Sequence, residues 1–196
     1  MRSNAWFFLL AATLVGAAIP SFAQVTPAAT NREIPLVLGA GFSDFNADFG
    51  AGRRIAGGAI WADWNLTQMP GIFRGLGVEI LARDLSLNDP SLPNMRYDTA
   101  EGGILYHVPL RQNLRVYAKA LGGFGSIDFP PAPHYAHDSR TPLAVGGGAD
   151  VHVWNHLWVR VDYEYQIWPD MFRHHALTPN GFTIGPGFDF RTRRSR

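Results

Sequence analysis

An alternation with a period of two residues runs through most of this chain and separates apolar positions from charged ones. In the segment 157–168, the odd positions from Val159 to Ile167 are apolar or aromatic, whereas the even positions from Arg160 to Gln166 are charged or polar. Successive side chains point to opposite faces in a β-strand, so this period predicts strands. Each strand must then contact an apolar medium on one face and polar groups on the other.

The first 23 residues have the three parts of an export signal. A basic start at Arg2 precedes an apolar stretch from Ala5 to Ile19, and Ser21-Phe22-Ala23 supplies a small-residue exit. This order is typical of a cleavable secretory signal, and we expect the mature chain to begin near Gln24. A membrane-spanning helix needs about 20 apolar residues. No later segment reaches that length, which excludes a helical membrane protein.

Composition narrows the class of protein further. Removing Arg2 with the signal leaves 16 basic residues (17 minus 1) against 16 acidic ones, so the mature chain carries no net charge. A neutral chain gives no support to nucleic-acid binding. The chain has no cysteine, although small exported domains often rely on disulfides. Closure of a sheet can hold the fold instead, because every interior backbone group then finds a partner.

Eight segments carry the alternation. We predict strands at about 36–45, 54–65, 76–83, 97–108, 114–127, 143–153, 157–168 and 182–190. Four of the connections are long and rich in Asp, Pro, Asn and His, namely 46–53, 84–96, 128–141 and 169–181, whereas 109–113 and 154–156 are short. Only the segment 67–75, after the second expected strand, departs from this alternation of long and short connections. Short turns at one end and longer loops at the other are typical of outer-membrane barrels. The sequence therefore predicts an all-β fold, an eight-stranded antiparallel up-and-down transmembrane β-barrel.

The expected domain organisation follows from these segments. We predict a cleavable signal peptide at 1–23, a polar leader at 24–33, an outer-membrane β-barrel at 34–191 and a basic tail at 192–196. Both ends of the barrel would lie in the periplasm, with four loops outside. Pro186 falls inside the last expected strand, where it cannot donate a ladder hydrogen bond, and a bulge would accommodate it.

Charge assigns the two faces of the expected strands. A basic side chain that faces lipid at mid-depth costs about 2 to 4 kcal/mol, so we assign the charge-free face to lipid. The expected interior charges, which should form ion pairs because an unpaired buried charge is costly, are Glu79, Arg83, Glu101, Arg115, Lys119, Asp150, Arg160, Asp162, Glu164 and Asp189. Aromatic residues near strand ends predict contacts with the membrane interface; these are Phe42, Trp64, Tyr106, Phe124, Tyr165, Phe188 and Phe190.

The segment LAVGGGADVHVWNHLWVRVDYEYQIW at 143–168 combines a glycine-rich strand, a tight turn and an R-x-D-Y-E-Y-Q strand. Together with the closing PNGFTIGPGFDF, it resembles the small outer-membrane β-barrels of Gram-negative bacteria, the OmpA-type and OmpX-type barrels. The resemblance covers essentially the whole mature chain. It implies a location in the outer membrane and insertion by the barrel assembly machinery, which reads a terminal aromatic residue. Here Phe190 is followed by RTRRSR, whereas family members often stop at the aromatic.

The width of an eight-stranded barrel limits its function. Side chains fill such a tube, so we predict an envelope structural or adhesion-type surface-interaction protein rather than an open porin. The sequence does not identify the surface partner. We predict no enzyme activity, because HHALTPNG at 174–181 lacks a serine two positions after its histidines and so does not match the His, Ser and acid arrangement of lipid A deacylases. We also predict no cofactor, because the sequence has no phosphate-binding glycine loop, nucleophile elbow or zinc signature.

A metal site is not expected either. His134 and His137 form a His-x-x-His pair on one expected loop, and His174 and His175 lie on another. Neither pair has acids in a fixed spacing nearby, as a metal site would need. Two alternatives stay open. A soluble periplasmic lipocalin-like barrel that binds an apolar ligand would show the same alternation with the faces exchanged, and an outer-membrane lipid A-modifying enzyme would share the barrel.

Overall fold

The computed structural model describes residues 35–48, 54–66, 69–87, 95–129, 136–171 and 175–190. These residues belong to one compact unit, Ile34–Arg196. The expected signal peptide, polar leader and basic tail lie outside the described residues, as do His134 and His174. Within the described ranges, no helix has the length and apolar character needed to cross a membrane.

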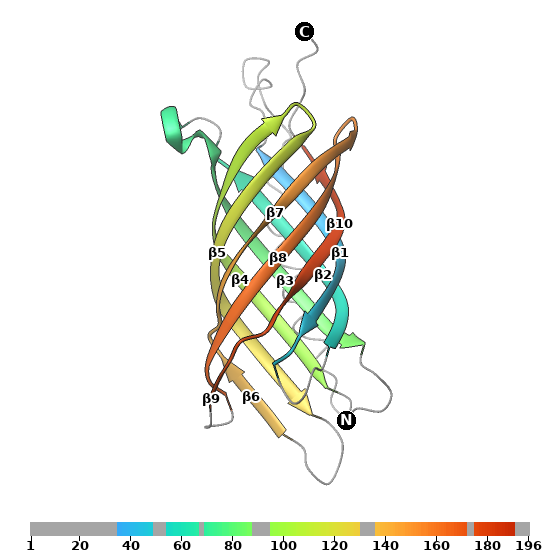
Figure 1. The fold of residues 1–196 in the computed structure, drawn as a ribbon, viewed down its shortest axis with the longest axis vertical. Helices are drawn as coiled ribbons and strands as arrows, with labels where there is room; N and C mark the ends of the chain where they lie inside the picture. The colour runs from blue at the N-terminus through green and yellow to red at the C-terminus, as the bar shows by residue number, and fades with distance from the viewer. Residues whose placement is uncertain are drawn as a thin grey trace, which may run out of the picture. The chain divides into compact units, whose positions relative to one another are not determined.

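Eight antiparallel strands form a closed ring (Figure 1). In ring order they are β10 (Asn180–Asp189), β1 (Leu36–Asn46), β2 (Arg54–Asn65), β3 (Leu76–Leu87), β4 (Arg96–Arg111), β5 (Leu114–Phe129), β7 (Leu143–Trp154) and β8 (Leu157–Met171). Strand β8 pairs with β10 and closes the ring. The predicted eight-stranded antiparallel up-and-down barrel is confirmed.

The two ends of the ring differ in their connections. At one end, which we call the turn end, β4 and β5 are joined by Gln112–Asn113 and β7 and β8 by Asn155–His156. The 3-10 helix η2 (Gly71–Gly75) connects β2 to β3 at this same end. The opposite end, the loop end, carries the other four connections and the short strands β6 (Ala136–Arg140) and β9 (His175–Leu177). The two-residue turns agree with the predicted short connections, whereas the connection between β2 and β3, residues 66–75, is a long one at the turn end.

The long connections predicted at 128–141 and 169–181 contain two short strands that the alternation does not predict. Strand β6 pairs with β5, where Gly125 lies opposite Arg140, and β9 pairs with β8. The ring partner of β5 on that side, β7, begins only at Leu143 opposite Gly122. The last part of β5 therefore offers free backbone groups, and the polar sequence AHDSR pairs with them although it has no strand pattern of its own.

Several strands are longer than predicted at the loop end. Strand β3 continues past 83 to Leu87, and β5 continues past 127 to Phe129. The outward-facing positions just beyond the predicted limits are Asp84 and Asp128. The alternation of apolar and charged residues ends where the strand leaves the apolar medium. The backbone pairing continues beyond that point, so the strands are longer than the pattern indicates.

Pro186 interrupts one ladder without shifting it. The pairing of β1 with β10 runs from Val37↔Asp189 to Gly39↔Gly187 and resumes at Phe42↔Ile184 with the same register. The expected bulge is therefore not formed, and the two strands simply lack paired residues beside the proline. On the other side Pro186 keeps its place opposite Val159 of β8, so that the ring stays closed.

Burial alternates along the strands as the sequence pattern predicts. Apolar residues such as Ile60, Ile80 and Phe124 are exposed on the outer surface, and the charged positions point inward. At the loop end the interior is apolar: the buried cluster there, which we call the apolar plug, consists of Phe45, Ala47, Ile55, Leu85, Met95, Tyr97, Ile127, Phe129 and Trp168. The plug and the inward charges together fill the bore.

Inward-facing glycines make room for two large side chains. A Cβ at Gly39 would lie 2.2 Å from the indole of Trp61, and a Cβ at Gly125 would lie 2.2 Å from the indole of Trp168. No real Cβ tolerates such distances, so the indoles occupy space that any larger residue would remove. The glycine-rich polar face is therefore a packing requirement of a narrow barrel.

Candidate functional site

The inward charges form the densest polar cluster in the described residues. All ten charges expected in the interior point into the barrel from six strands, and none is more than 7% exposed. Buried charges are tolerated only when they are paired and hydrogen-bonded. The stability of this cluster therefore depends on the partners of each charge.

Arg160 on β8 is one centre of the cluster. Its guanidinium lies 2.5 Å from Asp63 Oδ2, 2.8 Å from Glu79 Oε2 and 2.9 Å from Asp150 Oδ1. These three carboxylates come from β2, β3 and β7, so a single side chain ties four strands together. Asp150 is shared with Arg115, whose Nε lies 2.8 Å away.

Sequence reasoning missed Asp63. The segment 54–65 has a tryptophan in each alternate set of residues, Trp61 in one and Trp64 in the other, so its alternation is weak. The structure turns Trp61 inward, where its ring lies 5.1 Å from the Arg160 guanidinium, and Asp63 follows on the same face. Asp63 follows Trp61 by two residues and therefore shares its face of the strand. This spacing is the sequence signal that would have identified Asp63.

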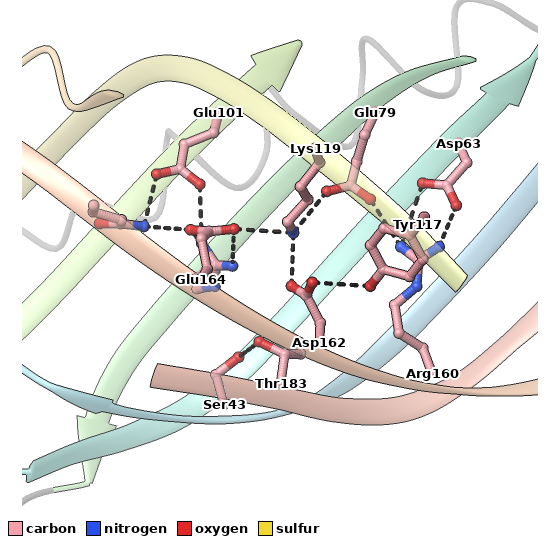
Figure 2. Close-up of polar contacts among 12 residues, drawn as sticks. Ser43, Asp63, Glu79, Glu101, Tyr117, Lys119, Arg160, Asp162, Glu164 and Thr183 are labelled. Carbon is pink, nitrogen blue, oxygen red and sulfur yellow. Dashed lines mark hydrogen bonds and ion pairs between the residues drawn. The ribbon is translucent and has the colours of Figure 1, made fainter. Parts of the chain in front are cut away.

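Lys119 on β5 is the second centre. Its ammonium lies 2.6 Å from Asp162 Oδ2 and 2.9 Å from both Glu79 Oε1 and Glu164 Oε2. The hydroxyl of Tyr117 donates a hydrogen bond of 2.9 Å to the other oxygen of Asp162. Figure 2 shows these contacts as one connected set. Glu79 belongs to both centres, because its two oxygens contact Lys119 and Arg160 separately.

Arg83 on β3 extends the network toward the loop end. It donates to Glu101 at 2.9 Å and, through both terminal nitrogens, to Glu164 at 2.8 and 2.9 Å. Since Glu164 also contacts Lys119, the ion pairs are continuous from Glu101 to Arg115. We call this chain of contacts, which consists of Asp63, Glu79, Arg83, Glu101, Arg115, Lys119, Asp150, Arg160, Asp162 and Glu164, the ionic network.

The last of the ten expected charges, Asp189, lies at the turn end of the network. Its Oδ2 is 3.9 Å from Arg115. Seven buried acids, Asp63 included, therefore face four buried bases. Each base serves at least two carboxylates, which is the arrangement that lets an interior rich in acids stay paired.

Gln166 joins the ionic network to the apolar plug. Its amide nitrogen donates to Glu101 at 2.8 Å and to Glu164 at 2.7 Å. Its amide oxygen accepts hydrogen bonds from Trp168 Nε1 at 2.8 Å and from the hydroxyl of Tyr97. The side-chain amide of Gln166 thus satisfies the polar atoms of both plug aromatics and also hydrogen-bonds to the ionic network. No buried side-chain polar atom of Tyr97 or Trp168 is left unpaired where the plug meets the network.

The seven aromatic residues predicted for the membrane interface all lie on the outer surface. Their exposed fractions range from 38% for Tyr165 to 77% for Phe124. Phe188 packs against Phe190 with 4.9 Å between ring centroids, at the turn end. Contact of these rings with lipid headgroups stays a prediction.

The apolar outer surface ends at the loop end in a row of outward acids, which we call the rim: Asp44, Asp84, Asp98 and Asp128. Arg54 lies 2.9 Å from Asp44, and Arg96 lies 2.8 Å from Asp84 and 3.0 Å from Asp98. Because an outward charge is costly in lipid, we infer that the rim groups lie beyond the membrane-spanning part of the strands. Partial burial raises the pKa of Asp98 to about 6; Arg96 opposes this shift, and the carboxylate of Asp84 adds to it.

One rim contact has the atom order of a hydrolytic relay. His137 on β6 contacts Asp128 through Nδ1, and its Nε2 lies 3.1 Å from the Oγ of Ser139. Sequence reasoning treated His137 only as half of a histidine pair and missed its serine, although His-x-Ser at 137–139 is the spacing it sought elsewhere. In the part of the chain that the structure describes, no group of three or more potential ligands is placed to hold a metal.

A closed ring of eight strands with apolar residues outside and paired charges inside defines the class of protein: a transmembrane β-barrel. A soluble lipocalin-like barrel would need the opposite arrangement, with its apolar residues in the bore. Matching against family models gives the same class. The outer membrane protein beta-barrel domain family matches residues 8–190, and the chain belongs to this family. It is a barrel of the outer membrane.

Solved structures agree on the fold. Neisserial surface protein A has a TM-score of 0.63 at 10% identity, over 79% of this chain and 96% of that one. The N-terminal β-barrel domain of OprF from Pseudomonas aeruginosa has a TM-score of 0.53 at 14% identity, over 80% of this chain and 100% of that domain. No curated protein matches the sequence.

Proposed function

We propose that this barrel is a surface-interaction protein of the outer membrane, whose closed body holds the loop-end connections for binding outside the cell. The observation that carries the proposal is the filled bore. The ionic network crosses it, and behind that network Phe45, Tyr97 and Trp168 are fully buried in the apolar plug. A barrel whose interior is filled by side chains has no channel for solutes, so we place its function at its surface.

The rim gives such loops a stiff base. Arg54 joins the ends of β1 and β2 through Asp44, and Arg96 joins β3 and β4 through Asp84. The connection between β8 and β10 is tied back to β1, because Asp48 accepts hydrogen bonds of 2.8 Å from both the backbone nitrogen and the hydroxyl of Thr178. Loops held at both ends lose less conformational entropy on binding a partner.

Two measurements test the proposal. In planar lipid bilayers the purified barrel should give no porin-like conductance steps, and regular large steps would overturn the closed-body premise. In cells that lack the native gene, a variant with residues 88–94 and 130–135 replaced by short Gly-Ser linkers should restore resistance to detergent as well as the wild type does. The same variant should fail to restore adhesion to host-cell or abiotic surfaces. Equal adhesion would show that the loops do not carry the function.

Export and assembly are part of the same proposal. We propose that the signal is cleaved after Ala23 and that the barrel assembly machinery recognises β10, on whose outer face Phe182, Ile184 and Phe188 lead to Phe190. The mass of the purified protein tests the cleavage site directly. The variant F190A should lower the amount of assembled barrel while leaving the total amount of exported chain similar, and unchanged assembly would remove Phe190 from the signal.

The ionic network itself has no catalytic role in this proposal, but the contact of Asp128, His137 and Ser139 favours a second candidate function, ester hydrolysis. The Oγ of Ser139 would attack an ester carbonyl while its proton passes to His137 Nε2. The departing alcohol would take that proton, and water would release the acid from the acyl-serine. Asp128 lies on the outward face of β5, in line with lipid-facing Phe124, so the substrate would be an acyl ester of the adjoining leaflet.

A serine-reactive probe separates the two candidates. A fluorophosphonate should label the folded barrel at Ser139 if the relay is active, and the variant S139A should abolish both labelling and hydrolysis of p-nitrophenyl esters. Ser126 lies opposite Ser139 in the β5–β6 ladder, so S126A is the matched control and should change neither. Absence of labelling in the folded wild type would remove the second candidate and leave the first intact.

A further inference from the structure

The helix η2 exposes two large apolar residues at the turn end. Ile72 is 76% exposed and Phe73 is 55% exposed, and η2 has no buried residue among its five. Soluble surfaces rarely place two large apolar side chains side by side on a turn that packs neither of them. The connection between β2 and β3 therefore needs an apolar environment that the barrel itself does not supply.

The position of η2 beside the barrel wall indicates what that environment is. The hydroxyl of Tyr106, an outward-facing residue of β4, donates a hydrogen bond of 2.6 Å to the carbonyl oxygen of Ile72. Figure 1 shows η2 projecting sideways from the wall next to the ends of β2 and β3. The helix is thus joined through Tyr106 to the outer surface of the barrel, on the same side as the lipid-facing residues.

The level of η2 along the barrel supports the same reading. In the ladder of β3 and β4, Tyr106 lies opposite Leu76, the residue that follows η2. Strand β4 then continues past this level with two more outward apolar residues, Val108 and Leu110, which are 41% and 57% exposed. The apolar outer surface of β4 therefore continues toward the turn end beyond Leu76, the residue at which β3 begins after η2.

Two exposed arginines at the turn end complete the pattern. Arg74 follows Phe73 within the helix and is exposed, and Arg111 is exposed at the end of β4. Apolar residues flanked by arginines are typical of segments that lie in a lipid interface, because the apolar groups enter the acyl region while the guanidinium groups reach phosphates.

We propose that η2 is a lipid-interface anchor of the barrel, in which Ile72 and Phe73 insert among the acyl chains of the leaflet at the turn end and Arg74 contacts phospholipid phosphates. The occupant of this surface is phospholipid, because the surface is continuous with the lipid-facing belt through Tyr106. The anchor fixes how deeply the turn end sits in the membrane. It does not depend on what the loop end binds.

Spin labels at single cysteines test the anchor, and the natural chain contains no cysteine that would interfere. The full-length barrel is reconstituted in phosphatidylethanolamine and phosphatidylglycerol vesicles, with I72C and F73C as the test variants. The control I80C marks the lipid-facing belt, and N113C, in the turn between β4 and β5, marks water. A heat-dependent gel shift confirms that each labelled variant is folded.

We expect the labels at 72 and 73 to collide more often with oxygen than with a water-soluble nickel complex. The label at 80 should behave in the same way, and the label at 113 should show the opposite preference. Labels at 72 and 73 that behave like the label at 113 would overturn the proposal. So would a short distance between two labelled copies, since η2 would then cover a second chain. The variant R74Q should shift the labels toward water in vesicles with anionic lipid, and an unchanged depth would remove the phosphate contact.

Discussion

Arg83 and Glu164 meet in the middle of the barrel although they come from opposite sides of it. Their strands, β3 and β8, stand four places apart in a ring of eight, and the Nη2 of Arg83 lies 2.8 Å from Glu164 Oε2. The pair spans the bore at a point where neither side chain contacts bulk water. It therefore links stability and closure: the same contact that holds the two walls together fills the space between them.

Removing Arg83 should be among the most damaging single substitutions. The variant R83M keeps an unbranched apolar stem but leaves Glu101 and Glu164 without their shared cation, and breaking a buried pair in this way costs about 3 to 5 kcal/mol. Urea unfolding in lipid vesicles measures the loss. The matched control is R54M at the exposed rim pair with Asp44, which should cost about 0 to 1 kcal/mol. Similar losses for both variants would mean that the interior ion pairs are hydrated.

A charge on the outer surface should be costly only at mid-depth. Ile80 lies on β3 within the apolar belt, and I80R should lower the free energy of unfolding in vesicles by about 2 to 4 kcal/mol. Leu87 is exposed to a similar degree on the same strand but at the loop end, so L87R should cost about 0 to 1 kcal/mol. An equal cost at both positions would place the belt elsewhere.

Glycine at 125 should be required by the apolar plug. The variant G125A places a Cβ against the indole of Trp168, and displacing a packed side chain costs about 1 to 3 kcal/mol. A Cβ at Gly58 meets no atom within 4 Å, so G58A on the outer surface should change stability little. Comparison of the two unfolding midpoints is the measurement, and a neutral G125A would indicate that Trp168 packs elsewhere.

Asp98 at the rim should make stability depend on pH. Its pKa in the folded protein, about 6, lies above its ordinary value of 3.8 because of partial burial and the carboxylate of Asp84. The folded state then binds the proton more tightly, so this contribution is complete below 3.8 and is lost as the pH rises through about 6. D98N removes the titrating group, so the wild type should lose stability relative to D98N between about pH 4 and pH 6. A constant difference between the two proteins would contradict the shift.

The sequence predicted the fold class and most inward charges, because a period of two residues is a local property. It could not predict which charges meet. Lys119 pairs with Glu79 and Asp162 across strands that are distant in the chain, and such contacts depend on register and on the width of the ring. Asp63 was missed because its strand has a tryptophan in each set.

Elements outside the apolar belt were beyond the reach of the pattern. Strand β6 forms because β5 has free backbone groups, and η2 carries no alternation at all. The relay of Asp128, His137 and Ser139 joins two strands of which only one was expected. An alternation in the sequence indicates which medium surrounds a strand. Strand β6 depends instead on which backbone groups of β5 are left free by its neighbours.

The most direct test of the account is whether lipid contacts the apolar outer face of the barrel and does not reach its interior. Methyl groups of isoleucine and leucine are observed by NMR in nanodiscs that contain a small fraction of doxyl-labelled lipid. Ile80 and Ile104 point outward, and their chain neighbours Leu81 and Leu105 point inward. The account predicts strong signal loss for the two isoleucines and nearly full signal for the two leucines. Equal loss within each neighbouring pair, or greater loss for the leucines, would contradict it.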